Sequence, residues 1–211
     1  MKRLVAILAS ALFVFALSAP IAQGFDLPKL PGVSSGVAAS TQSPDEVLKN
    51  YRNTLYSFVK AEFGLATAMN GSNDLAAQRA LLENMKTGDA AATKEDIQTL
   101  VSLNSAAKAE IDKKAAENTK LDASNKALAS QSMLEYVRAL VSMKKLAGSV
   151  QGLASNPVSL GANLGTVTYI TKETPGLISK GASTTSTMFK YLGSNGVDLT
   201  EAKKEAAGLG V

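Results

Sequence analysis

The most constraining feature of this sequence is that residues 94–147 contain no glycine or proline. Glycine and proline are the strongest breakers of an α-helix, so their absence here favours helical structure. The stretch is also unusually long for a single helix of a compact domain. We therefore expect two helices with a break between them, in the turn-prone polar segment from Asn118 to Asn125.

A capping sequence marks the start of an earlier helix. Ser43 is a favourable N-cap, Pro44 suits the first helical position, and Glu46 is placed to close a capping box. Asn70 and Gly71 are typical of a left-handed helix end. Between these signals, apolar residues recur at steps of about three or four: Leu48, Tyr51, Leu55, Phe58, Leu65 and Met69. The pattern predicts a helix with one buried face.

Weaker signals predict further helices. A short helix should end at the stop formed by residues 87–88, and Thr93 with Asp96 should cap the next one. Asp198 with Glu201 should cap a last short helix. The helix that begins near Thr93 has a narrow, alanine-rich face that favours close, coiled-coil-like packing: Ile97, Leu100, Ala107, Ile111 and Ala115.

The segment after the long glycine-free stretch has less decisive patterning. Residues 160–170 keep helical spacing, although residues 166–171 also have a strand-like composition. Helix is favoured here, and a strand is the alternative left open. Residues 175–176, a proline followed by a glycine, should interrupt the chain before another helix over residues 177–192.

Residue spacing also predicts which helix faces are buried. Leu55 and Phe58 on one helix, and Leu134 and Val137 on another, should face one shared core. Two acid–lysine pairs have the four-residue spacing that is favourable on an exposed helix face: Glu110 with Lys114, and Asp122 with Lys126.

Composition excludes several kinds of chemistry. The chain contains no histidine and no cysteine, which removes the commonest general base, the thiolate nucleophile and the usual zinc and haem ligands. Hydrophobic residues make up 45% of the chain, but aromatic residues only 5%, so the core must be thin and closely packed. Without disulfides, this packing alone must hold the fold together.

Three short motifs match spacings found in penicillin-recognising enzymes. Ser105 and Lys108, and Ser142 and Lys145, have the serine-x-x-lysine spacing, and residues 86–88 form a lysine-threonine-glycine triplet. In those enzymes the triplet follows the serine and lies on a strand, whereas here it precedes both serines and ends a predicted helix. We attribute the spacings to chance and expect no enzymatic activity.

The first residues have the pattern of a secretory signal peptide. Lys2 and Arg3 precede an apolar run over residues 4–17, and Ala22 with Gly24 supplies the small residues that a signal peptidase requires. Residues 1–24 are therefore predicted to be removed on export, and we expect a periplasmic location.

An uncleaved membrane anchor is the alternative for this leader. Pro20 interrupts the apolar run before it reaches the roughly 20 residues that a transmembrane helix needs, so cleavage before Phe25 is favoured. The following residues, 25–43, carry prolines, glycines and serines and are predicted to form a disordered linker.

The charge pattern argues against a nucleic-acid partner. The formal net charge is +4, and removal of Lys2 and Arg3 with the leader leaves +2. The lysines are interspersed with acids, and no aromatic residues alternate with them to form a stacking surface. We expect no nucleic-acid binding.

Glu62 is the one acidic residue within the apolar stripe that contains Phe58. A carboxylate there is either a buried ligand or switch, or it lies at the edge of a buried face that drifts around the helix. The drift is the favoured interpretation, with the buried face passing through Val59, Phe63 and Ala66.

Residues 146–171 contain no charged side chain. Within them, Gly161 and Gly165 have the spacing of two small residues that lets another helix approach closely. Together with Leu160 and Leu164 they form a candidate interaction surface. Packing within the same chain is the favoured role, and a partner surface, an oligomer interface or an interfacial membrane segment are alternatives.

These features predict an all-α fold. A bundle of four or more helices should occupy residues 44–153, with a small-residue-rich C-terminal helical portion, residues 154–211, packed on it. We expect an exported, non-catalytic protein of the bacterial cell envelope that acts as a binding, scaffold or accessory module, through an envelope protein or self-association and without cofactor or metal. The alternative is a carrier of a lipid or other apolar small ligand in a cavity between helices.

Overall fold

The structure of the chain is a computed structural model that describes residues 43–70, 74–85 and 92–210. The predicted leader, the linker before Ser43 and the triplet at residues 86–88 lie outside the described residues. The predicted all-α class is confirmed, because the described residues form helices and no strand. The α-helices are α1 (Pro44–Ala68), α2 (Ala76–Asn84), α3 (Lys94–Ala116), α4 (Ala123–Ala154), α5 (Leu164–Ser194) and α6 (Thr200–Ala206).

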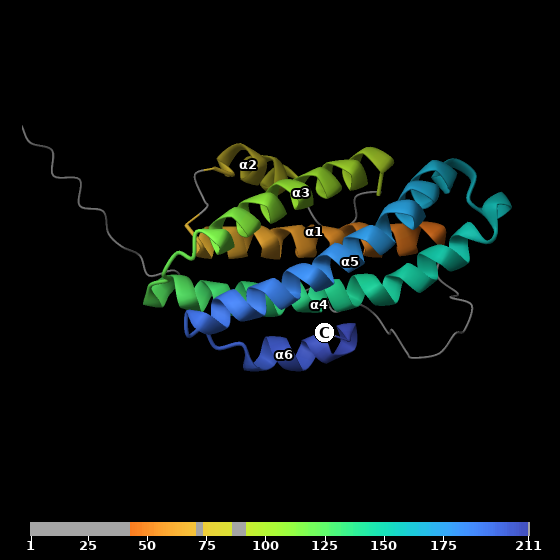
Figure 1. Cartoon of the computed structure of the whole chain (residues 1–211). Helices are drawn as coiled ribbons and strands as arrows, with labels where there is room; N and C mark the ends of the chain where they lie inside the picture. The colour runs from red at the N-terminus through yellow and green to blue at the C-terminus, as the bar shows by residue number, and fades with distance from the viewer. Residues whose placement is uncertain (1–42, 71–73, 86–91, 211) are drawn as a thin grey trace, which may run out of the picture.

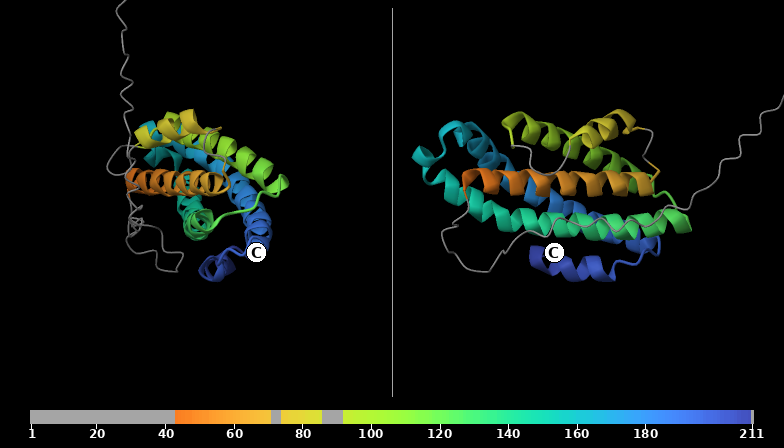
Figure 2. Two further views of the ribbon diagram at one scale, coloured as in Figure 1. Left: turned by 90° about the vertical axis from the view of Figure 1, so that its left-hand side faces the viewer. Right: turned by 180° about the vertical axis from the view of Figure 1, so that it is seen from behind.

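Four of these helices form a bundle (Figure 1). Helix α4 lies between α1 and α5, and α3 completes the arrangement by packing on both α1 and α5. Helix α4 runs antiparallel to the other three, whereas α2 and α6 lie on the outside, against α3 and α4 respectively (Figures 1 and 2). A helical bundle is therefore present, as predicted, but it is not confined to residues 44–153. Its fourth member, α5, comes from the C-terminal portion that was expected to pack on the bundle from outside.

The helix starts follow the local capping signals. Ser43 Oγ accepts a hydrogen bond from the backbone N–H of Glu46 at 3.3 Å, and a Glu46 carboxylate oxygen accepts one from the N–H of Ser43 at 3.1 Å. Thr93 Oγ1 likewise accepts from the N–H of Asp96 at 3.1 Å. Helix α3 ends at Ala116 and α4 begins at Ala123, so the predicted break in the glycine-free stretch is confirmed.

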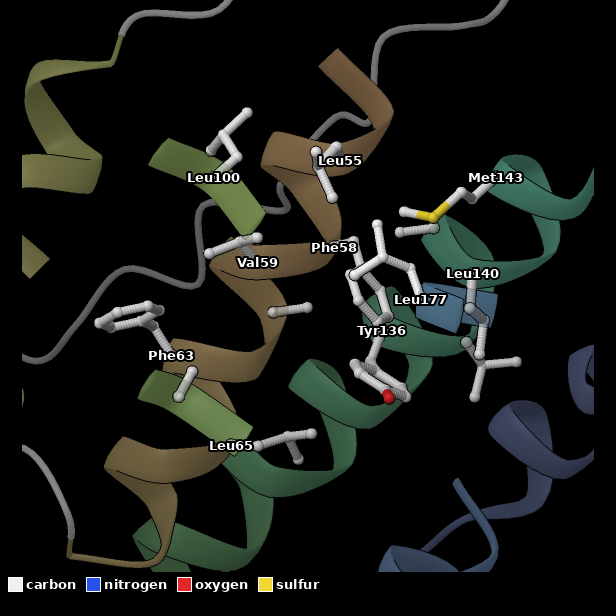
Figure 3. Close-up of a cluster of buried hydrophobic side chains, with 14 of the residues drawn as sticks. Leu55, Phe58, Val59, Phe63, Leu65, Leu100, Tyr136, Leu140, Met143 and Leu177 are labelled. Carbon is white, nitrogen blue, oxygen red and sulfur yellow. The ribbon is translucent and has the colours of Figure 1, made fainter. Parts of the chain in front are cut away.

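The core between α1 and α4 is built around two aromatic rings (Figure 3). The ring centroids of Phe58 and Tyr136 lie 4.7 Å apart, with 30° between their planes. Leu55 and Val137 are buried in the same cluster, as their spacing predicted, whereas Leu134 packs against it and stays only partly buried. Tyr136 also donates a hydrogen bond to the carbonyl of Gly181 on α5 at 3.1 Å, which ties α4 to α5.

Helix α5 continues through the proline at which an interruption was predicted. A proline inside a helix removes one backbone hydrogen bond, here the one to the carbonyl of Thr171, at a cost of about 3 kcal/mol. Pro175 itself is exposed, while Ile170 and Leu177 on either side of it are buried in the core. Tertiary packing thus maintains one helix from Leu164 to Ser194 and makes residues 166–171 helical rather than strand.

The prediction that the two acid–lysine pairs lie on exposed helix faces was partly wrong. Glu110 is buried rather than solvated, with Lys114 Nζ 3.8 Å from one of its carboxylate oxygens. It is adjacent to Ala107 and Ile111 on the helix surface, both fully buried, so the buried face of α3 is wider than its alanine-rich stripe indicated. Asp122 acts as the N-cap of α4, accepting from the N–H of Asn125 at 2.7 Å.

The predicted cap of the last helix was only partly right. The N-cap residue of α6 is Leu199, whose side chain makes no capping hydrogen bond. Asp198 contributes one position earlier, because its carboxylate accepts a hydrogen bond from the N–H of Thr200 at 3.0 Å.

Gly64 marks the closest approach of α1 to α4. A Cβ atom at Gly64 would overlap the hydroxyl of Ser132 and lie 3.1 Å from its Cβ. We expect Gly64→Leu to lower the free energy of unfolding by about 1–3 kcal/mol, because it overpacks this contact. Gly148→Leu on α4 is the matched control, since a Cβ there has nothing within 4 Å. Equal thermal unfolding of the two variants, measured by circular dichroism, would contradict this packing.

Candidate functional site

The candidate interaction surface lies at the tip of the hairpin that joins α4 to α5. We call residues 155–165 the tip. Two short 3-10 helices, η1 (Pro157–Ser159) and η2 (Gly161–Asn163), carry the chain from the end of α4 into α5. Asn163 donates a hydrogen bond to a carboxylate oxygen of Asp45 at 2.7 Å, which attaches the tip to the start of α1.

The apolar side chains of the tip divide into one anchor and two exposed groups. Leu160 is 3% exposed and belongs to the core cluster. Leu164 is 46% exposed and Val158 is 93% exposed. Sequence reasoning identified Leu160 and Leu164 but missed Val158. Its only signal was its place next to Pro157, in a segment without charges.

The two glycines of the candidate surface do not seat another helix of the same chain. Gly161 has a positive φ of 50° and lies in η2, whereas Gly165 lies in the first turn of α5. Both are exposed, and a Cβ built on either would have no atom of another described residue within 4 Å, apart from its own chain neighbours. Their spacing therefore does not describe one face of a continuous α-helix. Of the four residues of the candidate surface, Leu160 packs within the chain as favoured, whereas no described helix approaches closely at either glycine.

A groove runs between α4 and α5 behind the tip. Its volume is about 340 Å³, and its apolar wall includes Ala147 and Val150 on α4 with Pro175 and Ile178 on α5. Among the described residues that line the groove, Lys144 alone is charged. Because this groove depends on how α4 and α5 pack, no local sequence signal could have located it.

The two threonine hydroxyl groups on the α5 side of this groove donate hydrogen bonds within α5. Thr174 Oγ1 donates to the carbonyl of Ile170 at 2.6 Å, and the hydroxyl of Tyr51 lies 2.8 Å from the same oxygen. Since Thr174 donates elsewhere, Tyr51 is the donor in this buried bond, and burial raises the pKa of Tyr51 to about 12. Thr171 Oγ1 likewise donates to the carbonyl of Val167 at 2.9 Å.

A second, shallower depression lies between α4 and α6. Its volume is about 430 Å³, and it is lined by Lys144, Lys145 and Lys204 together with Glu205. The carboxylate of Glu205 lies 3.2 Å from the guanidinium of Arg138. Because Lys144 lines both spaces, the apolar groove and the basic depression meet at this residue.

Glu62 lies in the core between α1 and α3, not at the edge of a buried face as favoured from the sequence. Its side chain is 1% exposed, and its carboxylate accepts a hydrogen bond from Asn104 Nδ2 at 2.6 Å. Burial raises the pKa of Glu62 well above its usual value, and the hydrogen bond from Asn104 opposes this in part. Val59, Phe63 and Ala66 are buried too, so α1 is covered on more than one side.

Ser105 and Lys108, which form one of the serine-x-x-lysine spacings, are engaged in local structure. Ser105 Oγ donates to the carbonyl of Val101 at 3.1 Å, and Lys108 Nζ lies 2.5 Å from a carboxylate oxygen of Asp112. Within residues 43–70, 74–85 and 92–210, no three Asp, Glu, His or Cys side chains gather as a metal site would require. In the same ranges, no helix has the length and hydropathy needed to span a bilayer.

No protein-family model, no curated protein and no solved structure matches this chain. The geometry of the hairpin tip, the groove and the basic depression is therefore what bears on function.

Proposed function

We propose that this protein is an exported, non-catalytic binding module of the bacterial cell envelope that binds a protein partner through the α4–α5 hairpin tip. Support for export comes from the leader, with its basic start, apolar run and small residues at 22 and 24. Support for binding comes from the tip, where apolar side chains are exposed and charges are absent.

The exposure of Val158 and Leu164 carries this proposal. Soluble proteins expose scattered apolar residues, but exposed apolar groups that share one short, charge-free segment are typical of interaction sites. In the described part of the chain, only three large apolar residues are exposed, and two of them lie in the tip. The third, Leu81, lies on α2, away from the hairpin (Figure 1).

Leu164→Ser should reduce recovery of the partner several-fold in a pull-down from envelope extracts, because it removes apolar area from the contact. Leu81→Ser is the matched control: Leu81 is 47% exposed and Leu164 is 46% exposed, so both changes remove a similar apolar surface from water. Mass spectrometry of the recovered proteins, with light scattering to detect self-association, measures the outcome. Equal recovery by the two variants would contradict a role for the tip.

A carrier of an apolar ligand is the second candidate function, and the groove between α4 and α5 favours it. Its volume of about 340 Å³ lies at the lower end of the range for small-molecule sites. The groove is open along the surface of the bundle, so a ligand would lie along α4 and α5.

A further inference from the structure

The apolar groove between α4 and α5 and the basic depression between α4 and α6 meet at Lys144. We propose that together they bind one ligand, an anionic amphiphile with a single hydrocarbon chain. The chain lies in the groove, and the anionic headgroup lies at Lys144, Lys145 and Lys204. This inference rests on the carrier function named above and adds the chemical class of its ligand.

The groove has the lining that a hydrocarbon chain requires. Ala147 and Val150 face Pro175 and Ile178 across it, and these four side chains offer no hydrogen-bonding group. The hydroxyl hydrogens of Thr171 and Thr174 are donated to carbonyls within α5, and Pro175 has no N–H to donate. On the α5 wall a polar ligand would therefore find the exposed Ser179 hydroxyl as a donor but neither threonine hydroxyl. A chain of methylene groups needs no donor and loses no hydrogen bond on entering the groove.

The dimensions of the groove fit one chain. On α4, its lining residues run from Lys144 to Gln151, which corresponds to about 10 Å of helix. A volume of about 340 Å³ over that length leaves room for one narrow chain rather than for a helix of another protein.

The basic depression supplies the complementary charge at the end of the groove. Its described lining contains three lysines and one acid, Glu205, whose carboxylate lies 3.2 Å from the guanidinium of Arg138. Within the described residues, no carboxylate pairs with Lys144, Lys145 or Lys204. The ammonium of Lys144 lies 3.2 Å from the carbonyl oxygen of Gly208 and 3.4 Å from that of Leu209, so it is held beside the depression. A bound anion would neutralise this local positive charge.

Isothermal titration calorimetry of the purified protein with decanoate tests whether the groove and the depression bind an anionic amphiphile. The decanoate concentration is kept below that at which decanoate forms micelles. Decanol is the neutral probe of the same chain length. We expect decanoate to bind at one site, and the double variant Lys145→Gln/Lys204→Gln, at two lysines that line the depression but not the groove, to weaken decanoate binding about tenfold, because charge-assisted hydrogen bonds contribute free energy of this order. Decanol binding should be unchanged in that variant. Lys94→Gln/Lys120→Gln removes the same charge from exposed positions elsewhere and should leave decanoate binding as in the wild type.

A second variant tests the groove itself. Ser179 lines the groove and is exposed, so Ser179→Trp should fill the groove without entering the core and abolish binding of both probes. Decanoate binding that is unaffected by the lysine variant would overturn the inference, although the carrier function would survive if Ser179→Trp still blocked decanol. Absence of binding by both probes would overturn the inference and the carrier function together. Leu164→Ser should not change either titration, which separates this site from the tip.

Discussion

Replacing Phe58 with aspartate should abolish the cooperative folding of this protein. The Phe58 side chain is 1% exposed and packs on Tyr136, so its loss alone would cost about 3–5 kcal/mol. The new carboxylate would also lie one helical turn from Glu62, in a core that already holds one buried acid. Since domains of this size are stable by only about 5–15 kcal/mol, the sum removes most or all of that margin.

Circular dichroism with thermal unfolding measures this outcome. Phe58→Leu is the conservative control and should fold with a lower melting temperature, because it keeps an apolar side chain at the same place. Leu81→Asp tests whether any new aspartate has the same effect, and it should unfold like the wild type because Leu81 is exposed. An unchanged melting temperature for Phe58→Asp would mean that the packing of α1 on α4 is incorrect.

Stability should fall as the pH rises because of Glu62. The pKa of this buried carboxyl is raised well above its usual value, whereas in the unfolded chain a glutamate titrates near about 4.3. The folded state therefore holds the proton more tightly. The contribution of the protonated Glu62 carboxyl to stability is fully present below the pKa that this group has in the unfolded chain. It is lost as the pH rises from there towards the raised pKa of Glu62 in the folded protein.

Glu62→Gln should remove this pH dependence. Glutamine keeps an oxygen that accepts from Asn104 but never ionises, so the variant should be more stable than the wild type at pH 8 and similar to it near pH 5. Where the folded and unfolded states differ by one proton, stability changes by about 1.4 kcal/mol per pH unit. The charged neighbours Lys108 and Asp112 on α3 are unchanged in both proteins.

Urea denaturation between pH 5 and pH 8 measures the difference between the two proteins. Glu83→Gln on the exposed face of α2 is the control and should follow the wild type at every pH. Parallel pH profiles for the wild type and Glu62→Gln would contradict the buried, proton-holding state of this carboxyl.

Features that depend on a few adjacent residues could be predicted from the sequence. The capping box of Ser43 and Glu46 needs only the four residues that form it, and it has the predicted geometry. The break between α3 and α4 likewise follows from a short polar segment that contains the N-cap Asp122. Local energies decide such features, so their sequence signals are direct.

Features that depend on tertiary packing could not be predicted in this way. The sequence pattern favoured a position for Glu62 at the edge of a single buried face. In the structure both α3 and α4 pack on α1, so α1 is buried on more than one side. An amphipathic pattern with one apolar face does not describe such a helix. Pro175 should end a helix by local rules, yet the burial of Ile170 and Leu177 outweighs the lost hydrogen bond.

The candidate site was predicted only in part. The absence of charge over residues 146–171 drew attention to the correct segment. Periodicity could not place Gly161 in a 3-10 helix with positive φ, and it gave no reason to select Val158. The groove and the basic depression join residues far apart in sequence, such as Lys144 and Lys204, which only the packing of α6 on α4 brings together.

Site-specific photocrosslinking in intact cells tests most directly whether the hairpin tip is a binding surface. A photoreactive phenylalanine analogue at position 158, which is 93% exposed, is compared with the same analogue at position 81 on α2. We predict a discrete adduct of higher mass from position 158 after irradiation, and none from position 81. No adduct from position 158, or the same adducts from both positions, would contradict the proposal that this protein acts by binding through the α4–α5 hairpin.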